Sequence, residues 1–193
     1  MALIEGSSRP DELIGTNSAD EIYGFGGNDE IEGRNGIDYV EGGSGNDEIE
    51  GDDGNDDLYG QGGNDSLDGD KGRDVLHGGG GRDEVDGGTG DDKLVGGKGG
   101  DWIDGGNGAD TLIGGKGADI FEFETDDGND VINDWGNGGD RIDISDLDYS
   151  SFDDVMEDAR TVSGSTVFDF GSGFELVVLD TVKSEFAAGD FIL

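Results

Sequence analysis

The stretch that decides the fold is GGSGNDEIEGDDGNDDLYG, residues 42–60, in which glycine and acidic residues far outnumber apolar ones. Its only bulky apolar side chains are Ile49, Leu58 and Tyr59. Glycine loses more backbone entropy on folding than any other residue, and neighbouring carboxylates repel one another. Such a stretch cannot build an ordinary hydrophobic core, so either the chain stays unfolded or something cationic completes the fold.

The whole chain has the same bias. Its 193 residues include 42 glycines, 49 acidic and 11 basic residues, and they carry a formal net charge of −38. This charge would repel phosphate and anionic lipid, so the sequence predicts no nucleic-acid partner. No apolar run is long enough to span a bilayer, and the N-terminal residues lack the basic and apolar regions of a Sec signal. The absence of cysteine excludes disulfides and cysteine-ligated metal sites.

An internal repeat organises most of the chain. Residues 15–122 divide into twelve consecutive nonapeptides without an insertion. Position 1 is glycine, position 6 aspartate and position 8 apolar in every unit, and position 4 is glycine except at Ser18. A degenerate unit at residues 6–14 keeps Gly6, Asp11 and Leu13. A fixed period of this kind is typical of solenoid architectures.

Each nonapeptide predicts a turn over positions 1 to 6 and a short strand over positions 7 to 9. The glycines allow a positive φ and close approach of neighbouring backbones, and the middle strand residue points inward. Two nonapeptides then close one coil of a flattened solenoid, with a rise of about 4.8 Å per coil. The predicted inward column consists of the position-8 residues Ile22, Ile31, Val40, Ile49, Leu58, Leu67, Leu76, Val85, Leu94, Ile103, Leu112 and Phe121.

The position-6 aspartates fall into two rows, because alternate nonapeptides lie on the same edge of the solenoid. The first row holds Asp20, Asp38, Asp56, Asp74, Asp92 and Asp110; the second holds Asp29, Asp47, Asp65, Asp83, Asp101 and Asp119, and is extended by Asp11. Neighbours about 4.8 Å apart repel by roughly 0.9 kcal/mol in water and by about 3.5 kcal/mol at an effective dielectric constant of 20. Bare rows of this kind would push the coils apart.

A hard divalent cation between successive coils would reverse the sign of this interaction. Its ligands would be the carboxylates above and below and the carbonyls that the glycine turns leave unpaired. Calcium suits such a site better than magnesium, which demands tight octahedral geometry, or zinc, which prefers nitrogen and sulfur. Up to about eleven calcium ions would fill the gaps and change the formal charge from −38 to −16 (−38 + 22).

The nonapeptides resemble the GGxGxDxUx repeats of RTX proteins, in which U is a large apolar residue. The resemblance covers residues 6–122 and implies an all-β fold, a right-handed parallel β-roll. It also implies calcium ions in the turns between successive coils, held by aspartate side chains and main-chain carbonyls. The implied metal ligands are the aspartates named above, with carbonyls from turn positions 1 to 4. The position-1 glycines are Gly15, Gly24, Gly33, Gly42, Gly51, Gly60, Gly69, Gly78, Gly87, Gly96, Gly105 and Gly114.

The two outer faces of the predicted solenoid differ. One carries mainly acidic residues, and the other carries Tyr23, Tyr39, Tyr59 and His77, with apolar residues such as Val95 further along the chain. Two interpretations stay open: the later apolar positions pack under the C-terminal segment, or the aromatic residues form a shallow platform for a polymer or a partner.

Residues 123–193 are predicted to form a β-rich capping segment that contains a short helix. Alternating polar and apolar residues predict two strands joined by a glycine-rich turn at 136–139. Ser151 and Asp154 are spaced as in a capping box and predict the start of the helix. STVFDFGSGFELVVL, residues 165–179, predicts a hairpin with its turn at 171–173, and residues 184–193 predict a helical turn and an apolar tail.

This segment also resembles the C-terminal region of RTX proteins that are exported by the type I pathway. The resemblance lies in GNDVINDWGNGGDRIDISDL, residues 128–147, and in the closing DFIL, residues 190–193. It implies an uncleaved secretion signal, type I secretion machinery as a partner and an extracellular location. The alternative, that DFIL is simply the last strand of the cap, uses the same residues.

The sequence favours a calcium-binding module over an enzyme. His77 is the only histidine and lies at an outward-facing strand position, and no catalytic or cofactor-binding motif occurs. Three hypotheses remain. The chain is a secreted module that folds on calcium outside the cell and supports export, stability or display; or it is a polysaccharide-binding accessory module of a secreted carbohydrate-active enzyme such as an alginate epimerase; or it is a surface or matrix protein in its own right.

Overall fold

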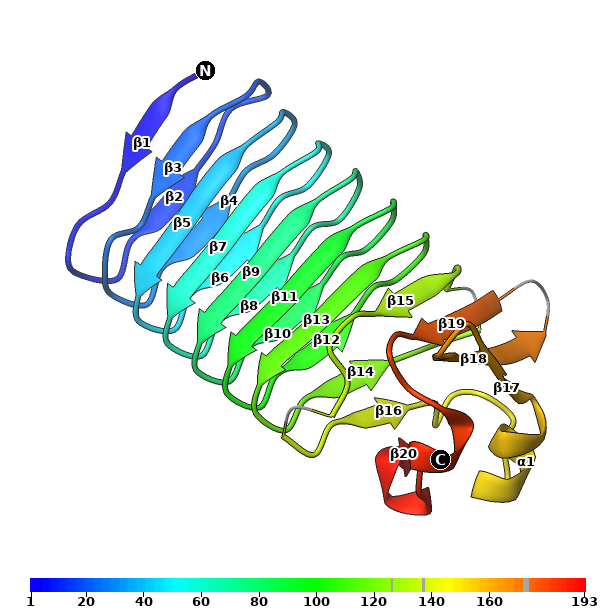
Figure 1. Ribbon diagram of the computed structural model, residues 1–193. Coiled ribbons are helices and arrows are strands. Elements are labelled where there is room, and N and C mark those ends of the chain that lie inside the picture. Colours follow the sequence, from blue (N-terminus) through cyan, green and yellow to red (C-terminus); the bar gives the residue numbers. More distant parts are fainter. Residues whose placement is uncertain (126, 137, 172–173) are drawn as a thin grey trace.

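The computed structural model describes residues 1–125, 127–136, 138–171 and 174–193. These residues form a parallel β-solenoid with two long sheets facing each other and a C-terminal segment at one end (Figure 1). In the first sheet the strand order is β1 (Leu3–Glu5), β3 (Glu21–Tyr23), β5 (Tyr39–Ser44), β7 (Asp57–Gly62), β9 (Val75–Gly80), β11 (Lys93–Lys98), β13 (Thr111–Lys116), β15 (Asp130–Ile132), β19 (Phe174–Val178), β18 (Ser165–Gly171) and β17 (Ala159–Val162). In the second it is β2 (Glu12–Ile14), β4 (Glu30–Glu32), β6 (Glu48–Glu50), β8 (Ser66–Asp68), β10 (Glu84–Asp86), β12 (Trp102–Asp104), β14 (Ile120–Glu122), β16 (Arg141–Asp143) and β20 (Phe191–Ile192).

The register of the strands confirms that two nonapeptides make one coil. Ile22 pairs with Val40 in the first sheet, and Ile31 pairs with Ile49 in the second, so each residue lies beside the residue that follows it by eighteen positions. Every repeat position is therefore stacked on its own copy in the next coil. The fold is the expected parallel β-roll.

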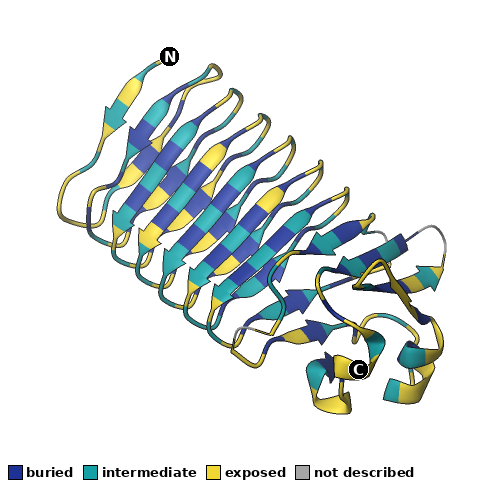
Figure 2. Ribbon diagram, viewed as in Figure 1, coloured by how far each residue is buried: buried dark blue, intermediate teal, exposed yellow. Residues whose placement is uncertain are grey.

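The inward column predicted at position 8 is the core of the solenoid. Each of its members is 0 or 1% exposed, and Leu13, which precedes the column, is 8% exposed. Figure 2 shows these buried positions as a dark band on the repeat strands, flanked by intermediate and exposed residues. Because each coil contributes one bulky apolar side chain per face, the core is only one side chain wide.

The strands of the first sheet are longer than the expected three residues. From β5 to β13 they run on through the position-1 glycine into the turn, so that Gly43 pairs with Gln61 and Ser44 with Gly62. In the second sheet the repeat strands keep three residues, and the turns that follow them pair through isolated bridges such as that of Asn35 with Asp53. The turns after both sheets thus stack in register on their own copies.

The two sheets continue beyond Glu122 through β15 and β16, the two strands expected in this part of the chain. Val131 pairs with Thr111, and Ile142 pairs with Phe121, although the sequence steps are now twenty and twenty-one residues. Insertions in the turns break the sequence period while the strands stay in the solenoid. Residue 137, in the expected glycine-rich turn, lies outside the described residues.

The C-terminal segment caps the open end of the solenoid. The predicted helix is α1 (Phe152–Glu157), and the Ser151 side chain accepts a hydrogen bond from the Asp154 backbone N–H. The predicted hairpin is formed by β18 and β19, which are antiparallel; residues 172–173 of its turn lie outside the described residues. Two 3₁₀ turns, η1 (Lys183–Glu185) and η2 (Ala188–Asp190), precede β20.

Aromatic side chains fill the cap. The Phe168 ring contacts the rings of Phe186 and Phe191 edge to face, with centroids 5.2 and 5.6 Å apart. The Trp135 ring lies 5.3 Å from that of Phe186 and 6.3 Å from Phe121, the last rung of the inward column. The cap core is therefore continuous with the core of the solenoid.

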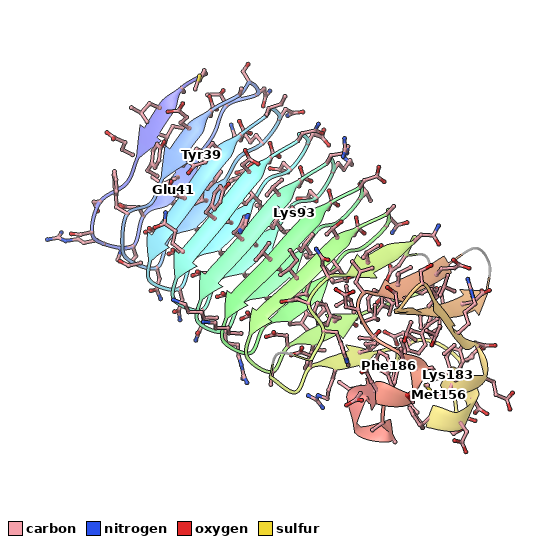
Figure 3. All side chains as sticks on the ribbon, viewed as in Figure 1. Tyr39, Glu41, Lys93, Met156, Lys183 and Phe186 are labelled. Atoms are coloured by element: carbon pink, nitrogen blue, oxygen red, sulfur yellow. The ribbon has the colours of Figure 1, made fainter. Side chains whose placement is uncertain are left out.

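A half-buried lysine ties the cap together. Lys183 Nζ donates hydrogen bonds to the carbonyls of Ala159, at 3.0 Å, and Met156, and Figure 3 shows Lys183 and Met156 close together in the cap. These contacts close the C-terminal end of α1 against η1. Among the described residues, no helix is both long enough and apolar enough to cross a membrane.

Candidate calcium centre

The position-6 aspartates form two buried rows along the edges of the solenoid. From Asp20 to Asp119 each of them is between 1 and 3% exposed, while Asp11 is half-buried. Within a row, each backbone N–H donates to Oδ1 of the aspartate in the next coil: Asp38 N to Asp56 Oδ1 at 2.7 Å, and Asp47 N to Asp65 Oδ1 at 2.9 Å. The structure thus brings together the carboxylates that the repeat predicts.

The second carboxylate oxygen of most of these residues is buried and has no hydrogen-bond donor among the described residues. This holds for Oδ2 of Asp29, Asp38, Asp47, Asp56, Asp65, Asp74, Asp83, Asp92, Asp101, Asp110, Asp119 and Asp130. A buried polar atom without a partner costs free energy, and native structures contain few of them. A repeated series of such oxygens indicates a missing ligand rather than a local defect.

Glycines and their carbonyls make the walls around these oxygens. A Cβ atom added to Gly24 would collide with Asp29 Oδ2 and with the carbonyl oxygen of Gly42 in the next coil. A Cβ atom added to Gly63 would collide with the carbonyl oxygen of Gly45. Positions 1 and 4 therefore need glycine because carboxylate and carbonyl oxygens of two adjacent coils converge on the space that a side chain would fill.

The electrostatics of the rows disfavour bare carboxylates. Burial above all, and to a lesser degree the neighbouring aspartates, raise the pKa of Asp56 and of Asp92 to about 7, although a backbone hydrogen bond opposes the shift. Burial likewise raises the pKa of Asp65 and Asp101 to about 6. Without a cation, these groups would hold protons that ordinary aspartates have already released at such pH values.

The first two turns differ from the rest. Oδ2 of Asp11 accepts hydrogen bonds from Ser7, and Oδ2 of Asp20 accepts them from Thr16, so neither oxygen is among the unpartnered ones. Although burial opposes it, hydrogen bonds from Ala2 and Thr16 lower the pKa of Asp20. The pKa of Asp20 is therefore lowered, whereas the pKa of Asp56 in the same row is raised.

Two aspartates that sequence reasoning missed extend the rows at the other end. Asp110 N donates to Asp130 Oδ1 at 2.9 Å, and Asp119 N donates to Asp140 Oδ1 at 3.1 Å. Both residues are buried. The signal was present in GNDVI, residues 128–132, and GGDRI, residues 138–142, which keep positions 4 to 8 of the repeat after short insertions.

The donor set suits calcium. It consists of carboxylate and main-chain carbonyl oxygens, the ligands that calcium prefers, in turns that adjust their geometry more easily than the octahedral shell of magnesium allows. The chain has no cysteine, and its one histidine, His77, stacks on Tyr59 at 5.1 Å on the outer face of the first sheet. The residues present therefore fit calcium and do not fit zinc.

Comparisons with known proteins agree with this geometry. The family model described as RTX calcium-binding nonapeptide repeat matches four times, at residues 5–40, 32–67, 59–94 and 86–121. No curated protein matches the chain. The fold is similar to that of the extracellular lipase LipA from Serratia marcescens, with a TM-score of 0.56 and 19% sequence identity over 99% of this chain.

The chain spans only 42% of the length of that lipase, so the likeness concerns the fold of a part. A second solved structure, the AlgE6R3 subunit of the Azotobacter vinelandii mannuronan C5-epimerase, aligns with a TM-score of 0.27 and 19% identity, over 96% of this chain and 80% of that one. The four family matches together run from residue 5 to residue 121, and they coincide with the stacked turns and buried aspartate rows. This chain belongs to the RTX calcium-binding nonapeptide repeat family.

Proposed function

We propose that this chain is a secreted calcium-binding module that folds around calcium outside the cell. The observation that carries the proposal is the series of buried Oδ2 atoms without a donor among the described residues. According to this proposal, the aspartates of the two rows and the turn carbonyls of positions 1 to 4 hold calcium ions between successive coils. The chain itself has no catalytic role and supports the export, stability or display of its own polypeptide or of an attached enzyme.

Calcium concentration supplies the switch in this proposal. Calcium sites in extracellular modules commonly bind in the range of about 10⁻⁴ to 10⁻³ M, far above cytosolic calcium. In the cytosol the charge of −38 would keep the chain extended, and the extended chain would suit passage through an exporter. A calcium titration followed by circular dichroism tests this, and β-sheet signal should appear only as calcium approaches the millimolar range.

The C-terminal segment fits a role in type I export followed by capping. RTX repeat proteins are typically secreted by type I systems. Phe191 is buried and pairs with Ile142, so in the folded chain DFIL contributes the last strand of the second sheet. In the unfolded chain the same residues are accessible as a signal. We therefore assign the calcium-binding β-roll to residues 6–122 and the cap with its secretion signal to residues 123–193.

Acid is expected to compete with calcium. The raised pKa values of Asp56 and Asp92, about 7, mean that the folded metal-free chain binds protons that the unfolded chain, with an aspartate pKa of 3.8, has lost. The stability that this protonation gives to the metal-free fold is complete below about pH 4 and is lost as the pH rises through about 7. Calcium needs the ionised carboxylates, and the metal-free chain at neutral pH is unfolded, with ordinary aspartate pKa values, so the apparent calcium affinity should change little from pH 8 to about pH 6 and fall steeply below about pH 5.

Calorimetric titrations at several pH values, each in two buffers of different ionisation enthalpy, measure both the affinity and the protons released. Proton release near about pH 4.5 that vanishes by about pH 6.5 is the expected pattern. An affinity that stays constant between about pH 6 and about pH 4 would contradict the assignment of the buried carboxylates as calcium ligands.

The aromatic platform is the surface relevant to the alternative, a polysaccharide-binding accessory module. Ring centroids lie 6.0 Å apart for Tyr23 and Tyr39, 5.3 Å for Tyr39 and Tyr59, and 5.1 Å for Tyr59 and His77. Figure 3 places Tyr39 beside Glu41 on the outer side of the first sheet, and the Tyr39 hydroxyl donates to Glu41. The Tyr59–His77 pair is stacked, whereas the other two pairs are tilted by 52° and 42°. Each ring thus packs against its neighbour along the sheet, and this contact pattern favours stabilisation of the sheet.

Replacing Tyr39 and Tyr59 by serine should therefore lower the free energy of unfolding in saturating calcium by about 0.5 to 1.5 kcal/mol for each aromatic pair lost. The double substitution by phenylalanine keeps the rings and is the matched control. Denaturant unfolding gives the stability, and a glycan-binding screen with and without calcium gives the alternative function. Loss of glycan binding at unchanged stability would favour the accessory module.

A further inference from the structure

Position 2 of the turn separates the first two turns from the later turns of the nonapeptide repeat, residues 24–122. In the later turns this residue has a positive φ, whether or not it is glycine; the set is Phe25, Arg34, Gly43, Asp52, Gln61, Asp70, Gly79, Gly88, Gly97, Gly106 and Gly115. Ser7 and Thr16 occupy position 2 of the turns at residues 6–11 and 15–20, and their φ is not positive. The two groups of turns therefore have different backbone paths.

With this different backbone path, the residue at position 2 donates hydrogen bonds to the aspartate at position 6 of its own turn. Thr16 N and Thr16 Oγ1 donate to Asp20 Oδ2 at 2.6 and 2.8 Å. Ser7 N and Ser7 Oγ donate to Asp11 Oδ2 at the same two distances. The same pair of contacts in both turns shows one recurring arrangement, made by a hydroxyl residue at position 2 that none of the later repeats has.

The contacts take up Oδ2, the carboxylate oxygen that is buried without a donor in the later turns. An oxygen with two donors within 2.8 Å has its lone pairs directed at those donors, and the donor hydrogens would repel a cation. Asp20 Oδ1 is also occupied, because it accepts a hydrogen bond from Ala2 N at 2.6 Å. Ala2 stands where the preceding aspartate of the row would stand, eighteen residues before Asp20. Both carboxylate oxygens of Asp20 are thus bonded to donors of this chain.

We propose that the turns at residues 6–11 and 15–20 close without calcium, and that Ser7 and Thr16 make the contacts that an ion makes in the later turns. The inference rests on the proposed calcium function, and it removes Asp11 and Asp20 from the ligand set. The coil formed by these two turns then keeps its shape without a shared ion.

Calcium stoichiometry tests the proposal. Native mass spectrometry in saturating calcium counts the ions bound to the wild type, to Asp20→Asn and to Asp92→Asn, a matched substitution in the middle of the same row. Asp20→Asn is expected to bind as many ions as the wild type, whereas Asp92→Asn should lose at least one. Circular dichroism at the same calcium concentration verifies that both variants are folded. Loss of an ion from Asp20→Asn would overturn the proposal.

Thr16→Gly tests the part played by the hydroxyl residue. The variant has glycine at position 2 of this turn, as the turn that contains Gly43 does. The exchange removes the hydroxyl and allows the positive φ. It is expected to bind one ion more than the wild type, and an unchanged count would overturn the role assigned to Thr16. A wild type that binds no calcium would instead refute the proposed function, so the two failures are distinguishable.

Discussion

Removing calcium from the folded chain is expected to convert the solenoid into a disordered polyanion. The core is one side chain wide, so apolar burial contributes little per coil against the entropy of ordering so many glycines. Adjacent carboxylates about 4.8 Å apart then repel by about 3.5 kcal/mol at an effective dielectric constant of 20. Each filled site instead stabilises the fold by roughly 2.7 kcal/mol when calcium is a hundredfold above its dissociation constant.

Far-UV circular dichroism and small-angle X-ray scattering measure this transition. With a chelator, the β-sheet signal should disappear and the radius of gyration should increase towards that of an unfolded chain; excess calcium should restore both. Magnesium at the same concentration is the matched control and should leave the chain disordered, because it gives up its water reluctantly. A chelated chain that stays compact would contradict the central role of the metal.

The substitution of Asp65 and Asp83 by asparagine is expected to raise strongly the calcium concentration that the chain needs to fold. These residues are consecutive in the second row, where Asp65 N donates to Asp83 Oδ1 at 3.0 Å. The site between them loses both carboxylates, and the sites on either side each lose one. The calcium concentration at the folding midpoint should rise on the order of tenfold or more, since each tenfold change corresponds to about 1.4 kcal/mol.

The transition should also become less steep, because the coils on either side of the damaged sites no longer fold as one cooperative array. Asp57→Asn with Asp91→Asn is the matched control: both residues are exposed, and each directly adjoins a row aspartate in the sequence. The control removes the same charge and should leave the midpoint nearly unchanged. Equal midpoints for the two double variants would show that overall charge, rather than ligand identity, governs folding.

The nonapeptide repeat by itself determines most of the fold. A strict period forces residues such as Ile49 and Asp47 to stack on their own copies in the next coil, so the inward column and the aspartate rows follow from the spacing. Local patterns also located α1 and the β18–β19 hairpin. Each of these features depends either on residues close together in the sequence or on residues separated by a constant eighteen positions. Both kinds of relation can be read directly from the sequence.

Tertiary structure decided the features that depend on contacts between residues whose separation in the sequence does not follow the repeat. Asp130 and Asp140 rejoin the rows after insertions, because strand pairing in the solenoid outweighs the length of a turn. β19 pairs with β15 across more than forty residues, a contact that no local pattern encodes. The donors that Ser7 and Thr16 supply also escape the sequence pattern, since what matters is the backbone path of the turn and not only the residue type. Periodicity sets which residues meet their copies; the folded backbone sets which polar atoms are left for an ion.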